Sequence, residues 1–188
     1  MTGSARRSQW RSLTNPNKAK GDRAEREALV FLQKHVPDLL CDRPQRRLGL
    51  GRSFDTGDLD AFEDVVVQVK NYAALATGLR HAAEGAEVQA QRAGLPFGVG
   101  MVMVPRLPIG DPYRWIFAAL EWPGGNPQCE AVVKDAKDLL IVLRATQGRP
   151  MLVRLERGNQ RPIFTSWLSR WVADYQLARA QFETSASI

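Results

Sequence analysis

The chain has few residues of the kinds that build disulfide frameworks and zinc sites. Its 188 residues include only two cysteines, Cys41 and Cys129, and two histidines, His35 and His81. Two distant cysteines are too few for a disulfide framework or a zinc cluster, and they are typical of reduced thiols in a cytoplasm-like compartment. Neither histidine has a partner at ligand spacing, so both are predicted to lie at the surface or at a helix end.

Long apolar runs are also missing. No stretch approaches the roughly 20 apolar residues that span a bilayer, so no membrane segment is predicted. Residues 1–13 are basic, but no apolar run follows them, which argues against a secretory signal. Ser-His-Asp, Cys-His and phosphate-loop patterns are absent as well. Hydrophobic residues still make up 44% of the chain, which is enough for a packed core.

Positive charge is concentrated in the first third of the chain. The net charge is +6, and residues 1–57 hold 12 Lys or Arg against 6 Asp or Glu, whereas the remaining residues hold 14 of each sign. A localised basic surface is typical of a polyanion binder. Charge alone fits a merely solvated basic face equally well.

The pattern along the chain predicts three parts: a flexible basic arm over residues 1–16, a core over residues 17–105, and a C-terminal extension over residues 106–188 that packs on the core. In the core, apolar residues at three- and four-residue spacing predict a helix over residues 18–35. Two strands joined by a tight turn follow, then an alanine-rich helix ended by Gly94, then an apolar strand. Strand, helix and strand in that order predict two parallel neighbouring strands, at residues 65–69 and 99–104.

The extension is expected to contribute a β-hairpin and a closing helix. Residues 138–145 and 150–156 are predicted to be strands joined by a turn, and residues 162–182 to form an amphipathic helix. The apolar stripe of this helix is predicted to be core rather than a base-stacking platform. It comprises Phe164, Trp167, Leu168, Trp171, Tyr175 and Ala178.

The segment DTGDLDAFEDVVVQVKNY, residues 55–72, carries the most specific chemical pattern. Because side chains alternate along a strand, Gln68 and Lys70 point to one side and the flanking valines to the other. A lysine on an otherwise buried strand is costly unless a group pairs with it. The nearest carboxylates are those of Asp58 and Asp60 across the turn, and hairpin pairing would bring one of them alongside. Asp58 is preferred because it directly follows the turn glycine.

A carboxylate, an amide oxygen and an ammonium group that converge on one spot favour a site for a metal ion and a water molecule. Asp58 would bind a hard cation such as Mg²⁺, and the Gln68 carbonyl oxygen would add a neutral ligand, as could the backbone carbonyl of Val69. Lys70 would hold the attacking water and stabilise charge on a phosphate. The pattern therefore indicates hydrolysis of a phosphodiester.

Two motifs give the chain a resemblance to a known family. Gly57-Asp58 followed by Gln68-Val69-Lys70 resembles the PD-(D/E)xK nuclease motif in its QxK form. Residues 20–27, KGDRAERE, resemble the opening-helix motif of archaeal-type Holliday-junction resolvases. The chain departs from the family at two positions, because glycine replaces the usual proline at 57 and glutamine replaces an acidic ligand at 68.

The resemblance implies an α/β restriction-endonuclease-like core, with a mixed central sheet of about four strands flanked by helices. It implies that Glu25, Asp58 and Gln68 hold Mg²⁺ or Mn²⁺ and that Lys70 completes the catalytic set. Branched or duplex DNA is the implied substrate, a homodimer the implied assembly, and the cytoplasm of a bacterial, archaeal or phage-infected cell the implied location. The expected DNA contacts are Arg6, Arg7, Arg11, Lys20, Arg46, Arg47 and Arg52.

Other interpretations stay open at this point. Glu25 fits an ordinary solvated ion pair on a helix. The chain also fits a phage or restriction-type nuclease that acts on duplex or single-stranded ends. A DNA-binding module of the same fold that no longer cleaves is conceivable because of Gln68, and the basic arm could be incidental to a structural or partner-binding protein.

Overall fold

The computed structural model describes residues 16–47, 57–125, 127–146 and 149–186. None of the helices in these ranges has the length and apolar content needed to cross a bilayer. The helices are α1 (Pro16–His35), the 3-10 turn η1 (Pro37–Leu39), α2 (Leu75–Ala93), α3 (Ala136–Ala145) and α4 (Leu168–Ala186). The strands are β1 (Gln45–Arg46), β2 (Leu59–Asp60), β3 (Val65–Lys70), β4 (Phe97–Met103), β5 (Trp115–Ala119), β6 (Ala131–Val133), β7 (Leu152–Leu155) and β8 (Ile163–Ser166).

The strands in the described ranges form one mixed sheet of eight, in the order β1-β2-β3-β4-β5-β8-β7-β6. The predicted parallel pair is confirmed, because β3 and β4 run parallel with Lys70 opposite Val102. The second parallel pair is β6 and β7, and the remaining pairs are antiparallel. Helices α2 and α3 are the crossovers of the two parallel pairs.

The sheet is therefore larger than the four strands that were predicted. Strands β5 to β8 of the C-terminal part extend the same sheet beyond β4. Residues 138–145 are also not a strand, because they lie within α3. The Asp135 carboxylate caps this helix by accepting hydrogen bonds from the backbone N–H groups of Lys137 at 2.7 Å and Asp138 at 2.9 Å. This cap and the burial of Leu139 and Leu143, one turn apart, outweigh the strand-like run of branched side chains.

The closing helix begins later than predicted, because residues 163–166 form β8. This strand lies between β5 and β7, where the buried Thr165 hydroxyl donates to the Val153 carbonyl at 2.9 Å. Within α4, Trp171 and Tyr175 are fully buried and stack with ring centroids 5.0 Å apart. Trp167, Trp171, Tyr175 and Ala178 are buried, so this part of the predicted stripe is core, as predicted. Phe164 lies in β8 rather than on the helix, and Phe164 and Leu168 are partly buried.

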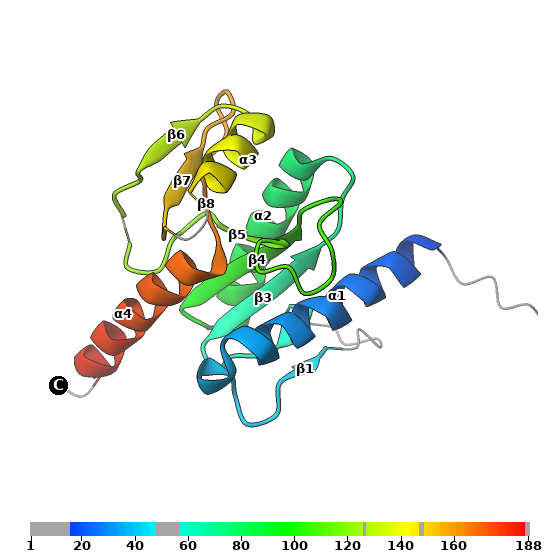
Figure 1. Cartoon of the computed structure of the whole chain (residues 1–188). Coiled ribbons are helices and arrows are strands. Elements are labelled where there is room, and N and C mark those ends of the chain that lie inside the picture. The colour runs from blue at the N-terminus through cyan, green and yellow to red at the C-terminus, as the bar shows by residue number, and fades with distance from the viewer. Residues whose placement is uncertain (1–15, 48–56, 126, 147–148, 187–188) are drawn as a thin grey trace, which may run out of the picture.

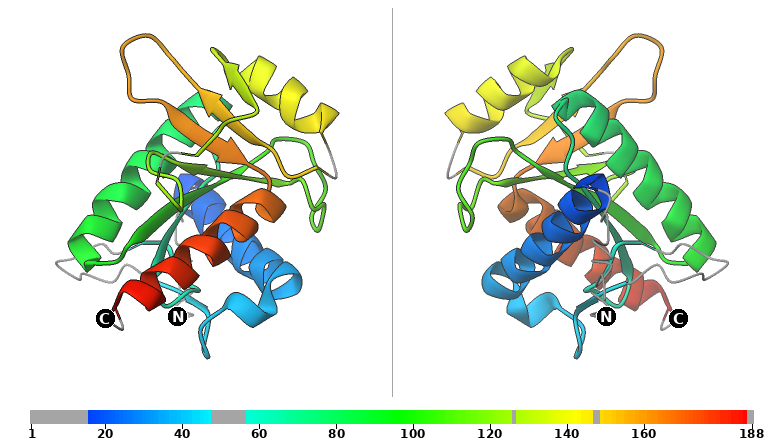
Figure 2. Two further views of the ribbon diagram at one scale, coloured as in Figure 1. Left: turned by 90° about the vertical axis from the view of Figure 1, so that its left-hand side faces the viewer. Right: turned by 90° about the vertical axis from the view of Figure 1, so that its right-hand side faces the viewer.

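Helices cover both faces of the sheet (Figure 1, Figure 2). One core contains buried residues of α1 and α4, such as Ala28 and Trp171, with Val67 of β3. The other contains buried residues of α2 and α3, such as Leu79 and Leu143. Strand β1 is the edge strand at one end of the sheet. Residues 57–70, which carry the chemical pattern, lie at this end, in β2, β3 and the turns beside them.

Two glycines of β4 let α2 approach the sheet closely. A Cβ atom at Gly100 would lie 2.5 Å from the Ala82 Cβ, and one at Gly98 would lie 2.5 Å from the Ala86 carbonyl oxygen. Any side chain at either position would push the helix away. The close approach also brings Gly85 of α2 against the side chain of Gln68, and the fold of the core thereby shapes the candidate site.

Candidate active site

Asp58 is held between two strands just before β2 begins. Its backbone N–H donates to the Val67 carbonyl at 2.9 Å, and its own carbonyl accepts from the Arg47 N–H at 2.9 Å. The preceding Gly57 has φ of 111°, and a Cβ there would lie 3.0 Å from a methyl group of Val66. Proline holds φ near −65°, so this turn excludes the proline that the family usually has. Glycine at position 57 is thus explained by the positive φ that this turn requires.

The Asp58 carboxylate gathers the groups that the sequence predicted around it. Its Oδ2 atom accepts hydrogen bonds from the Gln68 Nε2 amide and, at 2.7 Å, from the Val69 backbone N–H. The Lys70 ammonium lies 3.6 Å from the same oxygen. Side chains of Asp58 and Lys70 are 21% and 26% exposed, so the pair sits at the surface end of the strand and is accessible from solvent. Asp58, Gln68 and Lys70 therefore form one cluster.

Asp60, the alternative aspartate, belongs to a different contact. Its Oδ1 atom pairs with the Arg47 guanidinium at 3.1 Å. It lies two residues from Asp58 along the chain, opposite Gln45 of β1. The geometry thus places Asp58, rather than Asp60, beside the glutamine and lysine of β3.

Gln68 presents a buried amide at this cluster. The residue is 3% exposed, and its Oε1 atom has no hydrogen-bond partner among the described residues. That oxygen faces α2, where a Cβ at Gly85 would lie 3.5 Å from it. A half-turn of the carboxamide exchanges its oxygen and nitrogen positions with little change in shape. Gln68 can therefore turn either a donor or an acceptor toward Asp58.

Glu25 lies on α1 and is covered by an arginine. The Arg46 guanidinium contacts Glu25 Oε2 through Nη2 at 2.5 Å and through Nε at 3.0 Å. The same Nη2 contacts Asp22 Oδ1 at 3.0 Å. Side chains of Arg46 and Glu25 are only 15% and 19% exposed. Arg46, which was predicted to bind phosphate, is thus paired with two carboxylates of α1 in this structure.

The charge of Glu25 is disfavoured where it sits. Burial raises the pKa of its carboxyl group, and the nearby charge of Asp58 raises it further, whereas the hydrogen bond from Arg46 lowers it. Arg46 holds Glu25 and lies opposite Leu59, the residue after Asp58, so Glu25 is tied to the β2–β3 end of the sheet. Two carboxylates at this end of the sheet therefore need a positive partner, and Arg46 and Lys70 provide it.

The donor set suits a hard divalent cation. Within the described ranges, no three His, Cys, Asp or Glu side chains lie in a group that could hold a metal ion. The Gln68 amide contacts the Asp58 carboxylate, and a half-turn of the carboxamide would bring its Oε1, which has no protein partner in those ranges, to face that carboxylate. Oxygen ligands of this kind fit Mg²⁺, which keeps several waters and binds through one or two carboxylates. Glu25, Asp58 and Gln68 thus fit the cation that the motif implies.

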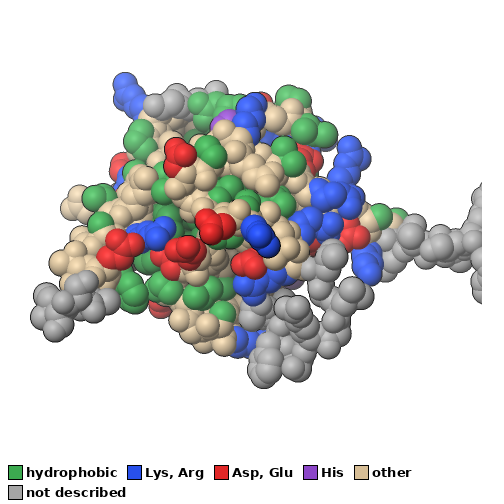
Figure 3. All heavy atoms as spheres, turned by 90° about the horizontal axis from the view of Figure 1, so that it is seen from below, with side chains coloured by type: hydrophobic (Ala, Val, Ile, Leu, Met, Phe, Trp, Pro, Cys, Tyr) green, Lys and Arg blue, Asp and Glu red, His purple; other side chains and the backbone are tan. Residues whose placement is uncertain are grey.

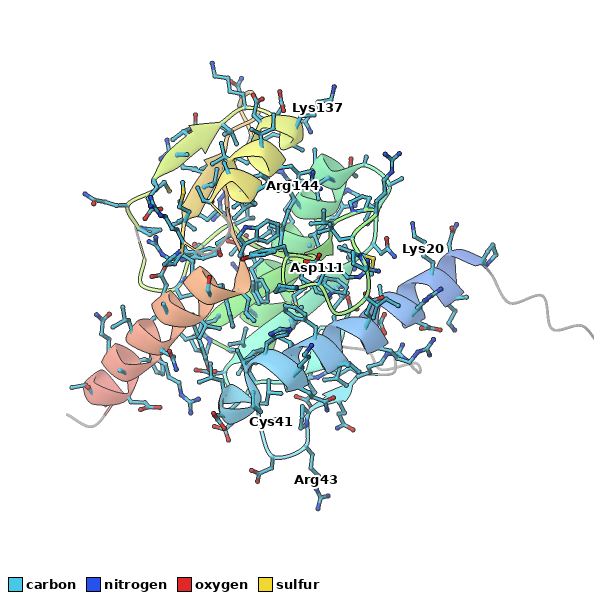
Figure 4. All side chains as sticks on the ribbon, viewed as in Figure 1. Lys20, Cys41, Arg43, Asp111, Lys137 and Arg144 are labelled. Atoms are coloured by element: carbon cyan, nitrogen blue, oxygen red, sulfur yellow. The ribbon has the colours of Figure 1, made fainter. Side chains whose placement is uncertain are left out.

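The predicted DNA contacts are distributed over several segments. Arg6, Arg7, Arg11 and Arg52 lie outside the described residues. Lys20 is exposed on α1, where its side chain extends away from the body, as does Arg43 after η1 (Figure 4). Toward the end of the molecule where α1 begins, Lys and Arg side chains gather at the surface (Figure 3). The exposed cations of this helix are Lys18, Lys20, Arg23, Arg26 and Lys34.

Two features near the cluster were not predicted. Tyr72, just past β3, has its hydroxyl 3.1 Å from His81 Nδ1 on α2, with the rings edge to face. His81 is exposed, as predicted, and no local spacing signals its contact with Tyr72, because the two residues lie in different elements. Asp22 was also missed as a neighbour of Glu25. Its spacing of three residues on a helix was a usable signal, because such residues share a face.

No protein-family model matches the chain. Comparisons with curated proteins and with solved structures gave no match either. The function proposed below rests on the geometry of these side chains and on the resemblance of the two motifs.

Proposed function

We propose that this chain is a Mg²⁺- or Mn²⁺-dependent endodeoxyribonuclease that hydrolyses phosphodiester bonds of branched DNA. The observation that carries the proposal is the convergence of the Gln68 amide and the Lys70 ammonium on one carboxylate oxygen of Asp58. Glu25 is tied to the same end of the sheet through Arg46, which lies opposite Leu59. Paired carboxylates beside an accessible lysine are suited to a metal-assisted attack of water on phosphate. Glu25, Asp58 and Gln68 would hold the cation.

The protein groups prepare this reaction by fixing positions and charge. When bound, a divalent cation supplies a Lewis acid that activates water and neutralises phosphate charge. The Val69 N–H bond fixes the Asp58 carboxylate at 2.7 Å, and the strand pairing on both sides holds its backbone. A rigid carboxylate needs no reorganisation during the reaction, which favours catalysis by preorganised electrostatics.

Lys70 is proposed to orient the attacking water and to stabilise the negative charge that develops on the phosphate. Its ammonium group is near the Asp58 oxygen and its side chain is 26% exposed, so it can reach both the cluster and a bound substrate. The bond from water oxygen to phosphorus forms while the bond from phosphorus to the 3′ oxygen breaks; the attacking water gives up a proton to solvent, and the departing 3′ oxygen takes one up from solvent. The expected products carry a 5′-phosphate and a 3′-hydroxyl.

Branched DNA is the proposed substrate, with a symmetric dimer that places two sites on opposing strands. The support is the KGDRAERE motif on α1, which carries exposed Lys20 and Arg23 beside the proposed ligand Glu25. The experiment compares nicking of a synthetic four-way junction, a flap and a plain duplex of the same sequence under Mg²⁺. The junction should be cut fastest, with paired nicks. Equal cutting of all three substrates would favour a general duplex nuclease.

A variant at Gln68 tests the metal set. Gln68→Glu should retain cleavage and bind Mg²⁺ more tightly, by about 10-fold, because a formal charge is added at a position that contacts Asp58. Without metal, the two facing carboxylates should lower the melting temperature, and added Mg²⁺ should restore it. Gln89→Glu is the matched control, because it places the same charge on another buried glutamine. Mg²⁺ should not rescue that variant, and rescue of both would remove Gln68 from the metal set.

A second candidate function is DNA binding without cleavage. The observation that favours it is the hydrogen bond from the neutral Gln68 amide to Asp58, at a position where the family usually has an acid. Such a protein would bind DNA with a salt-sensitive affinity and release no product at any Mg²⁺ or Mn²⁺ concentration. Product formation by the wild-type protein distinguishes the two functions.

A further inference from the structure

Arg46 lies where both a metal cation and a DNA phosphate would bind if the chain acts as proposed. Its guanidinium makes three contacts with Glu25 and Asp22, and only 15% of its side chain is exposed. A cation bound by Glu25 would compete with Arg46 for the same Oε2 atom. A DNA phosphate would compete with Glu25 for Arg46, because guanidinium groups bind phosphate as readily as carboxylate.

The strand that carries Arg46 is positioned for such an exchange. Among the described residues, strand β1 is paired on one side only, with β2. Its pairing places Arg46 opposite Leu59, the residue after Asp58. This pairing anchors the Arg46 backbone beside Asp58, so an exchange of partners would involve the side chain alone. The next residue, Arg47, pairs instead with Asp60.

The electrostatics favour replacement of Arg46 by a cation at Glu25 over a Glu25 that is left without any positive partner. The Glu25 side chain is 19% exposed, and its Oε2 atom receives two contacts from the Arg46 guanidinium. If Arg46 leaves, Glu25 and Asp22 lose their guanidinium partner. An uncompensated buried carboxylate is costly, so a divalent cation should bind there more readily once the guanidinium has gone.

We propose that Arg46 couples the two ligands: it blocks Glu25 in the absence of DNA and releases it when a DNA phosphate takes the guanidinium. This inference rests on the proposed metal site and adds its regulation. The cation therefore binds tightly only to the protein–DNA complex, and by reciprocity the cation tightens DNA binding. In the free protein, Arg46 neutralises Glu25 and Asp22 in place of a metal ion.

The test measures Mn²⁺ affinity with and without a four-way junction, by electron paramagnetic resonance of free Mn²⁺, after subtraction of the ions bound by DNA alone. All proteins carry Lys70→Met so that the junction stays intact. In this background the junction should raise Mn²⁺ affinity by at least about 10-fold, a typical size for coupled sites. Adding Arg46→Met should raise the DNA-free affinity by a similar factor and reduce the effect of the junction to about twofold or less.

Arg47→Met is the matched control, because it removes an equal charge from the adjacent residue of the chain, whose guanidinium pairs with Asp60. It should weaken junction binding at most and leave the effect of DNA on Mn²⁺ affinity unchanged. If Arg46→Met behaves like Arg47→Met, the coupling is wrong while the metal site stands. If no protein binds Mn²⁺ beyond the DNA-only level, the metal site itself is wrong and the coupling falls with it.

Asp22→Asn keeps the test decisive if Arg46→Met does not fold. This change removes the second carboxylate that holds Arg46 and leaves Glu25 intact. It should weaken the block and raise DNA-free Mn²⁺ affinity by a smaller factor than Arg46→Met. An unchanged or lower affinity in folded Asp22→Asn protein would overturn the proposal.

Discussion

Asp58→Asn and Lys70→Met are each expected to lower the single-turnover rate of DNA cleavage by about 10²- to 10⁴-fold, the range typical of lost electrostatic and acid–base groups. Asp58→Asn keeps the shape of the side chain but removes the charge that Lys70 and the proposed cation share. Lys70→Met keeps most of the side-chain volume and removes the ammonium group. Rates are measured with enzyme in excess over an end-labelled junction, so that binding and product release do not limit them.

Both variants should keep most of their DNA affinity, because the proposed DNA contacts are other residues, the exposed cations of α1 and the arginines of residues 1–15. Asp60→Asn is the matched control. It makes the same change two residues away, on the carboxylate that pairs with Arg47. It should cleave within a few-fold of wild type. If Asp60→Asn lost cleavage and Asp58→Asn kept it, Asp60 rather than Asp58 would be the motif aspartate.

Glu27→Ala is expected to destabilise the protein by about 3–5 kcal/mol, the usual cost of removing one partner of a buried ion pair. The Arg114 guanidinium contacts both Glu27 oxygens and also donates to the Leu107 carbonyl. Side chains of Glu27 and Arg114 are 10% and 13% exposed, so the arginine would keep a largely buried charge without its carboxylate. The pair connects α1 to the segment just before β5. Urea unfolding measures the loss.

The control for this pair is Glu156→Ala. Glu156 pairs with Arg154 of β7, but these side chains are 39% and 40% exposed. An exposed pair contributes about 0–1 kcal/mol, so the control should unfold near the wild-type midpoint. A loss below about 1 kcal/mol in Glu27→Ala would contradict a structural role for the pair. Glu27 would then need another role, because its pair with Arg114 is the contact through which it would hold α1 in place.

Local patterns predicted the parts of the fold that depend on nearby residues. The turn between β2 and β3 connects adjacent segments, and alternation along β3 was enough to place Gln68 and Lys70 together. Gly94 was a correct stop for α2, since it adopts φ of 66° at the end of the helix. These features are determined within about 20 residues, where periodicity and turn chemistry dominate.

Features that depend on distant residues were not predictable in the same way. Residues 138–145 form a short apolar run that fits a strand or a helix, and the burial of Leu139 and Leu143 in one core with Val153 of β7 favours the helix. Strand β8 exists because β5 and β7 provide neighbours on both sides. At the site, Arg46 reaches Glu25 across 21 residues of sequence, and no local spacing signals that contact. The phosphate-contact prediction for Arg46 accordingly overlooked its pairing with α1.

The most direct test of the proposed nuclease is the Mg²⁺ dependence of junction cleavage by the wild-type protein, with the 5′ ends of the products analysed. Single-turnover reactions are run over a Mg²⁺ titration, with a chelator control and with Asp58→Asn protein prepared in parallel. The proposal predicts cleavage that saturates with Mg²⁺, stops with the chelator, leaves 5′-phosphates and is lost in Asp58→Asn. Folded, DNA-bound wild-type protein that releases no product with Mg²⁺ or Mn²⁺, or an Asp58→Asn variant that cleaves at the wild-type rate, would contradict it.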